Sequence, residues 1–264
     1  MAPVIDMVRH AEAYGQEERN ILVVDKGLSD KGSNEAYELS KRYPYTKQIS
    51  HIVCAPDSSC VNTADKAFNR AMGEKGAIIL PELRTIGWQP TSDRISWESF
   101  KQECQGVWLN LRRLPTTARD ISLDDAPDEE LVEKRAREAR AFIRQLACQA
   151  PVDAHIVVIA DGLVLHYLTG DFAGLSETAF TSYENAHFRS FEFKNLDGDD
   201  LDATLEETKQ SHENSQLPLY TSLSEVEQAR LKSFATRRIK KQKESFRKII
   251  EGGRPSVQTQ DWSR

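Results

Sequence analysis

Short, mostly apolar segments alternate with helix-like segments along the first three quarters of this chain. The candidate strands cover residues 3–8, 49–54, 77–80, 155–160 and 188–193. Helices are expected over residues 30–42, from residue 58 onward and, most clearly, over 129–149, where apolar residues recur at helical spacing. Because strands that alternate with helices fold into layered sheets, the sequence predicts an α/β fold.

Composition excludes several classes of protein. The chain has 264 residues, enough to bury a large core without disulfides, and 35 basic against 41 acidic residues give a net charge of −6. Such an acidic balance argues against general nucleic-acid binding, and no apolar run approaches the roughly 20 residues of a membrane span. The first residues lack the pattern of a secretory signal. The four cysteines and six histidines show no metal-ligand spacing. We expect a cytoplasmic protein with no membrane contact, no cofactor and no metal.

The last third of the chain changes character. An acidic, amide-rich stretch is followed by a capping-box match at residues 222–225, which predicts the start of a helix. Nine basic residues lie between 230 and 248. We expect the apolar stripe of this helix to dock on the rest of the chain. An acidic or phosphate-rich partner for its basic face, self-association through residues 222–250, and a flexible tail remain alternatives. The predicted division is an α/β domain at 1–195, an acidic linker at 196–221 and a basic helical extension at 222–264.

Polar groups follow three of the predicted strands where each strand ends. Arg9 and His10 follow the first strand, the segment 55–59 follows the second, and Asp161 follows the strand at 155–160. Ligands of open α/β sheets bind at the carboxyl ends of the strands. The sequence therefore predicts a functional site at this edge.

Short motifs occur in a fixed order over residues 3–193. They are Val8-Arg9-His10-Ala11, Leu28-Ser29-Asp30-Lys31-Gly32, Ala55-Pro56 with Asn62-Thr63-Ala64, Leu83-Arg84, Ser92-Asp93-Arg94, residues 157–162 leading into 165–169, and residues 188–193. Together they resemble the histidine phosphatase superfamily, the phosphoglycerate mutase-like proteins, and most closely its small fungal members. The resemblance implies a three-layer α/β/α sandwich and phosphoryl transfer through a phosphohistidine.

The resemblance implies roles for five positions, and two of them match. Arg9 and His10 match the first phosphate-binding arginine and the nucleophilic histidine. Ser59 stands where the family has a second arginine, Thr85 where it has a glutamic acid, and Asp161 where it has a second histidine. We therefore expect a degenerate catalytic site, with less positive charge facing a phosphate and one added carboxylate.

Further residues are candidates for binding a ligand beside Ser59 and Thr85. Arg84 could supply a cation, and Gln16 could line the mouth of the site. His166 lies on the helix expected after Asp161 and could bind a ligand or make a structural hydrogen bond. The expected ligand is a small organic anion.

Three functions remain open. If Asp161 approaches His10, the carboxylate raises the pKa of the imidazole, and the pair suits acid/base chemistry with Arg9 holding an anion. We expect an isomerase, lyase, cyclase or hydrolase type of reaction on a small organic anion, in secondary metabolism. One alternative is a weak phosphatase or mutase acting through phospho-His10. The other is a non-catalytic pseudophosphatase that binds a partner or ligand.

Overall fold

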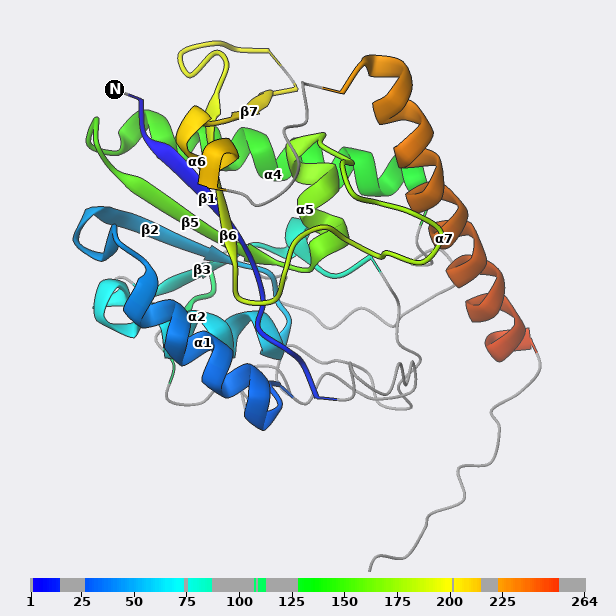
Figure 1. Cartoon of the computed structure of the whole chain (residues 1–264), viewed down its shortest axis with the longest axis horizontal. Helices are drawn as coiled ribbons and strands as arrows, with labels where there is room; N and C mark the ends of the chain where they lie inside the picture. Colours follow the sequence, from blue (N-terminus) through cyan, green and yellow to red (C-terminus); the bar gives the residue numbers. More distant parts are fainter. Residues whose placement is uncertain are drawn as a thin grey trace, which may run out of the picture.

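A seven-stranded mixed sheet forms the centre of the protein in this computed structural model (Figure 1). The structure describes residues 2–14, 27–73, 76–86, 107, 109–112, 128–200, 202–214 and 223–251, with backbone alone for 242 and 245–251. The strands are β1 (Val4–Arg9), β2 (Ile49–Cys54), β3 (Ala77–Ile79), β4 (Leu109–Asn110), β5 (His155–Ala160), β6 (Phe188–Phe193) and β7 (Leu205–Glu207). Their order across the sheet is β4-β3-β2-β5-β1-β6-β7.

The central strands are parallel and the β6–β7 edge is antiparallel. β5 lies between β2 and β1 and runs parallel to both, while β6 pairs antiparallel with β1 and with β7. All six residues of β5 are buried, because helices cover both faces of the sheet there. The apolar run that predicted this strand therefore reflects burial from two sides.

The helices form two layers around the sheet (Figure 1). Their bounds are α1 (Asp30–Arg42), α2 (Ser58–Met72), α4 (Glu129–Gln149), α5 (Gly162–Thr169), α6 (Lys209–Asn214) and α7 (Glu225–Glu251), with short 3₁₀ turns η1 (Thr46–Gln48) and η2 (Pro81–Leu83). α1 and α2 cover one face, and α4 and α5 cover the other. The expected three-layer α/β/α sandwich is confirmed. No helix among the described ranges is long and apolar enough to cross a membrane.

The long helix α7 docks on the α/β domain. Ala235 and Ile239 are buried in the core, so part of its predicted apolar stripe does pack. Several of its polar side chains bind the domain as well: Lys232 pairs with Glu133, Thr236 donates to Glu129 and Lys243 pairs with Asp128. Basic residues of α7 thus pair with acidic residues at the start of α4.

The segment predicted as an acidic linker carries two short elements, β7 and α6. Leu205 of β7 pairs with Phe193 of β6 and is 5% exposed. A three-residue strand with a single apolar side chain gives almost no periodic signal, so the sequence indicated only a loop here.

Candidate active site

The carboxyl ends of β1, β2 and β5 meet at one edge of the sheet. The His10 N–H donates to the Ala160 carbonyl at 3.2 Å, and the Ala55 N–H donates to the Ile159 carbonyl at 2.9 Å. Residues that follow β1 and β2 therefore lie on either side of the end of β5. The sequence predicted this convergence from the polar residues after each strand.

His10 is buried at this edge with its ring orientation fixed. Its Nδ1 lies 2.7 Å from the Ala11 carbonyl oxygen, which can only accept, so Nδ1 carries the proton in the neutral ring. Nε2 is left facing Asp161, 3.8 Å from Oδ2. Burial lowers the pKa of His10, but its ion pair with Asp161 more than offsets this, so the pKa lies above the ordinary 6.5.

Asp161 binds both its own helix and His10. It is the N-cap of α5, and its Oδ1 accepts a hydrogen bond from the Leu163 N–H at 2.9 Å. Burial raises the pKa of this carboxyl group, while His10, Arg9 and the Leu163 N–H lower it further, to about 2. Asp161 is therefore an anion at any physiological pH.

Arg9 at the end of β1 brings a positive charge to the same edge. Its Nη1 donates to the Tyr183 carbonyl at 2.9 Å. Its Nε is buried and has no hydrogen-bond partner within the described part of the chain. Burial lowers the pKa of Arg9, and Asp161 acts in the opposite direction, so the guanidinium stays protonated.

The loop after His10 is held by two helices. The Ala11 N–H donates to Thr63 Oγ1 at 3.0 Å, and the Thr63 hydroxyl donates to the Ser59 carbonyl, so the first turns of α2 contact this loop. On the other side, a Cβ added at Gly32 of α1 would lie 2.0 Å from the Glu12 carbonyl oxygen. Only glycine allows α1 to pack this closely. Ser59 is buried in the first turn of α2.

Thr85 is tied to Asp57, a residue that the sequence did not single out. The Thr85 N–H and hydroxyl both donate to Asp57 Oδ2, at 3.2 and 2.9 Å. A carboxylate therefore lies beside the position where the resemblance implies a glutamic acid. The signal was present, because Asp57 directly follows Ala55-Pro56 at a strand end.

The other two predicted binding residues are Arg84 and Gln16. Arg84 is exposed, and its carbonyl accepts a hydrogen bond from Arg135 of α4. Gln16 falls outside the described residues.

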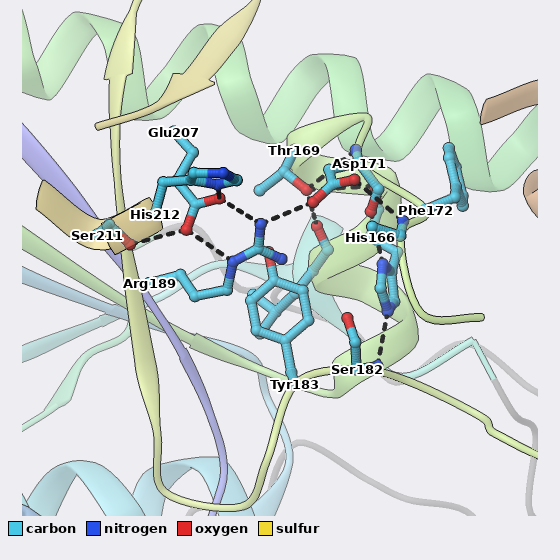
Figure 2. A network of polar contacts seen from close by, with 12 residues as sticks. His166, Thr169, Asp171, Phe172, Ser182, Tyr183, Arg189, Glu207, Ser211 and His212 are labelled. Atoms are coloured by element: carbon cyan, nitrogen blue, oxygen red, sulfur yellow. Dashed lines mark hydrogen bonds and ion pairs between the residues drawn. The ribbon is translucent and has the colours of Figure 1, made fainter. Parts of the chain in front are cut away.

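His166 is fully buried, and both of its ring nitrogens bind the protein itself. Nδ1 donates to the Asp171 carbonyl at 2.6 Å, and Nε2 accepts from the Ser182 N–H at 3.3 Å, as Figure 2 shows. Burial lowers the pKa of His166 to about 4. The ring is therefore neutral near pH 7 and makes the structural contacts that the sequence left as one of two options.

In the described part of this edge, the cation Arg9 and the anion Asp161 accompany the imidazole of His10, whose Nε2 faces Asp161. Such a group can move a proton, and Arg9 can hold a negative charge beside it. No cluster of three or more His, Cys, Asp or Glu side chains suited to a metal ion occurs within the described ranges.

The fold and this edge define an α/β protein whose polar site lies at the carboxyl ends of parallel strands. The model of the histidine phosphatase superfamily (branch 1) matches residues 5–199, and the chain belongs to that superfamily. No curated protein matches the chain.

Solved structures of several phosphatases are similar to this chain. An ecdysone phosphate phosphatase from Bombix mori, in complex with tungstate, has a TM-score of 0.55 at 12% identity, covering 79% of this chain and 93% of its own. A phosphoserine phosphatase mutant from Entamoeba histolytica has a TM-score of 0.44 at 15% identity, and the match covers 78% of this chain and 95% of its own. A mycobacterial glucosyl-3-phosphoglycerate phosphatase has a TM-score of 0.45 at 16% identity, and the match covers 78% of this chain and 98% of its own. At these identities the first similarity supports the fold alone.

Proposed function

We propose that this protein transfers protons to and from a small organic anion, with His10 as acid/base, Asp161 as its charge partner and Arg9 as the anion-binding group. The reaction is of the isomerase, lyase, cyclase or hydrolase type. The observation that carries the proposal is the approach of His10 Nε2 to Asp161 Oδ2, at 3.8 Å.

Each group has a role that follows from its contacts. With Nδ1 donating to Ala11, the Nε2 lone pair of neutral His10 is the base that accepts a substrate proton. The nearby Asp161 carboxylate stabilises the imidazolium that forms. As the substrate loses its proton, negative charge develops on its oxygen, and the buried Nε–H of Arg9, which has no partner among the described residues, is a donor for that charge.

Electrostatics disfavour a phosphate dianion in the same place. By the family resemblance, Ser59 removes a positive charge from the phosphate position and Asp161 adds a negative one. Losing a single preorganised donor typically costs about 10²–10³ in rate. A site with Arg9 as its remaining matching arginine therefore suits a carboxylate, enolate or phenolate better than a phosphate.

Hydrogen exchange in D₂O tests this proposal without knowledge of the full reaction. The wild-type protein is incubated with a panel of enolisable keto acids, and loss of the acidic C–H signal is followed by NMR. We expect exchange with at least one acid, and a decrease of at least about 100-fold in His10→Ala. Exchange that is equal in the two proteins would refute proton transfer by His10.

One observation favours phosphoryl transfer as a second candidate function. A histidine that donates through Nδ1 to a backbone carbonyl presents Nε2 as a nucleophile, and the His10–Ala11 contact has this form. Rapid mixing with 4-nitrophenyl phosphate would then give a burst of nitrophenol and a trapped phosphoenzyme that His10→Ala cannot form. Absence of both the burst and the phosphoenzyme would eliminate this function.

The exchange assay and the burst assay together also distinguish the pseudophosphatase alternative from the two enzymatic functions. A protein that binds ligands without turnover would show neither exchange nor a burst, although Arg9 would still bind the anion. Anion binding that is lost in Arg9→Ala, without activity in either assay, would favour that function over both enzymatic ones.

A further inference from the structure

We propose that the loop 171–183 is a positioning element for Arg9, held by His166 from inside and by helix α7 from outside. This inference rests on the proposed function only in taking Arg9 as the anion-binding group. It assigns His166 and α7 to the support of the active site rather than to ligand or partner binding.

The loop reaches Arg9 through one backbone carbonyl. Arg9 Nη1 donates to the Tyr183 carbonyl at 2.9 Å, and the Tyr183 N–H donates in turn to Thr181 Oγ1 at 3.0 Å. A Cβ added at Gly162 would lie 2.5 Å from the same Thr181 oxygen. The end of the loop therefore packs against the residue that follows Asp161 while it binds Arg9.

His166 joins the two ends of this loop (Figure 2). Its Nδ1 donates to the Asp171 carbonyl, at the start of the loop. Its Nε2 lies 3.3 Å from the Ser182 N–H and 3.1 Å from Thr181 Oγ1, at the end of the loop. Because a neutral imidazole is at once a donor and an acceptor, it fits both ends, and the buried ring stays neutral near pH 7.

The start of the loop is anchored by Asp171. Its Oδ2 accepts from Arg189 Nη2 at 2.7 Å, and Arg189 also binds Glu207 of β7 (Figure 2). Its Oδ1 accepts from the Ala173 N–H at 3.0 Å. Asp171 is thereby fixed to β6 and, through Glu207, to the antiparallel edge of the sheet.

Helix α7 holds the outer side of the loop at two points. Gln228 accepts from the Phe172 N–H at 2.8 Å and donates to Asp171 Oδ1 at 3.1 Å. Arg238 Nη2 donates to the carbonyls of Ser176, at 2.5 Å, and Ala179, at 3.0 Å. Its guanidinium also lies 4.1 Å from the centre of the Phe180 ring. α7 thus clamps the segment that leads directly into 181–183.

Release of the loop should therefore move the charge of Arg9. Arg9 lowers the pKa of His10, because it disfavours a second cation nearby, whereas Asp161 raises it. The pKa of His10 in the ligand-free protein thus reports where Arg9 lies. A loop that only stabilises the fold would change the unfolding temperature and leave this pKa unchanged.

The experiment is an NMR titration of the His10 ring in the full chain without ligand. Arg9→Ala sets the scale, and we expect it to raise the pKa of His10 by roughly half a unit to one unit. His166→Asn removes the acceptor near Ser182. It should raise the pKa of His10 by part of the shift seen in Arg9→Ala. His166→Gln, whose amide oxygen can reach the position of Nε2, should retain a value near wild type.

A second pair of variants tests the clamp from α7 without touching the interior. Arg238→Ala should shift the pKa of His10 in the same direction as Arg9→Ala. Arg237→Ala is the matched control, because Arg237 is an exposed neighbour of equal charge that lies over Phe234 and should leave the pKa unchanged. If Arg9→Ala shifts the pKa but His166→Asn and Arg238→Ala both leave it at the wild-type value, the positioning role is overturned.

These outcomes are independent of the proposed function. The loop can be coupled to Arg9 even if no proton exchange is detected with any acid, in which case the positioning role stands and the reaction does not. The opposite result is also possible: hydrogen exchange could depend on His10 while His166→Asn and Arg238→Ala leave the pKa of His10 unchanged. That result would support the reaction and refute the positioning role.

Discussion

His10 Nε2 lies 3.8 Å from Asp161 Oδ2, at the point where the resemblance to the superfamily implies two histidines facing a phosphate. The two residues follow adjacent parallel strands, β1 and β5, so strand pairing itself brings them together. Because Asp161 also caps α5, its carboxylate is held by the helix that follows it. The pair is therefore built into the backbone of the fold, and its electrostatics can be tested without a substrate.

Replacement of Asp161 by Asn should lower the pKa of His10. The carboxylate favours the imidazolium. Once it is removed, burial is the largest remaining influence on the pKa of His10 and acts downward, while the Ala11 carbonyl acts upward and Arg9 downward. We expect a decrease of about one unit, measured by NMR titration. Asn is also a good N-cap, so α5 should persist. Asp200→Asn is a control, since Asp200 is an exposed carboxylate that binds Arg144, and its replacement should leave the pKa of His10 unchanged. A pKa of His10 unaffected by Asp161→Asn would contradict the ion pair.

The same carboxylate should make stability depend on acid pH. Its pKa is about 2 in the folded protein, below the ordinary 3.8, so its contribution is complete above pH 4 and is lost as pH falls toward 2. The full contribution is on the order of 2 kcal/mol. Urea unfolding of wild type and Asp161→Asn between pH 5 and 3 should show free energies that converge as the pH falls. Parallel curves over this range would be inconsistent with the low pKa.

His166 should impose a second and separate pH dependence. Its pKa falls from the ordinary 6.5 to about 4 on folding, so the unfolded chain takes up a proton first as the pH drops. Stability should therefore decrease between pH 6.5 and 4, by up to about 3 kcal/mol. His166→Gln has no group that titrates there, so its loss of stability over this window should be smaller. Differential scanning calorimetry of the two proteins measures the difference, and equal slopes would contradict a neutral buried ring.

Much of the fold could be predicted, because burial leaves a pattern in the sequence. β5 was visible as an apolar run since both of its faces are covered, and α4 through its helical spacing. β7 was not predicted, because this three-residue edge strand buries a single apolar side chain and so leaves no periodic pattern in the sequence. The sequence placed a capping box at residues 222–225, and the structure has one two residues later, where Ser224 and Glu227 bind each other reciprocally at the start of α7.

The site was predictable only where side chains mark the strand ends. Arg9, His10 and Asp161 could be placed together because each lies at the end of a parallel strand or directly after it. The Tyr183 carbonyl that binds Arg9 could not, since a backbone acceptor is the same in every residue. The function of His166 depends on a loop that returns to it after 15 residues, and no local pattern encodes that return.

Asp6 should be the residue of β1 whose charge matters most for stability. It is 0% exposed, and its two oxygens accept from three donors on different elements: Tyr43 at the end of α1, His155 of β5 and Ser190 of β6. Asp6→Ala would leave these donors buried without their acceptor, so we expect a loss of about 3–5 kcal/mol.

Tyr43→Phe provides the graded comparison, because it removes one of the three donors and leaves the carboxylate with the other two. Its cost should be about 1.5–3 kcal/mol, that of one hydrogen bond to a charged group. Urea unfolding at pH 7 measures both variants. The difference between them reports how strongly stability depends on the contacts of Asp6 with His155 of β5 and Ser190 of β6, three residues before Arg9. Equal losses in the two variants would mean that Tyr43 alone carries the contribution of Asp6, and that the contacts with His155 and Ser190 add nothing to the placement of the site.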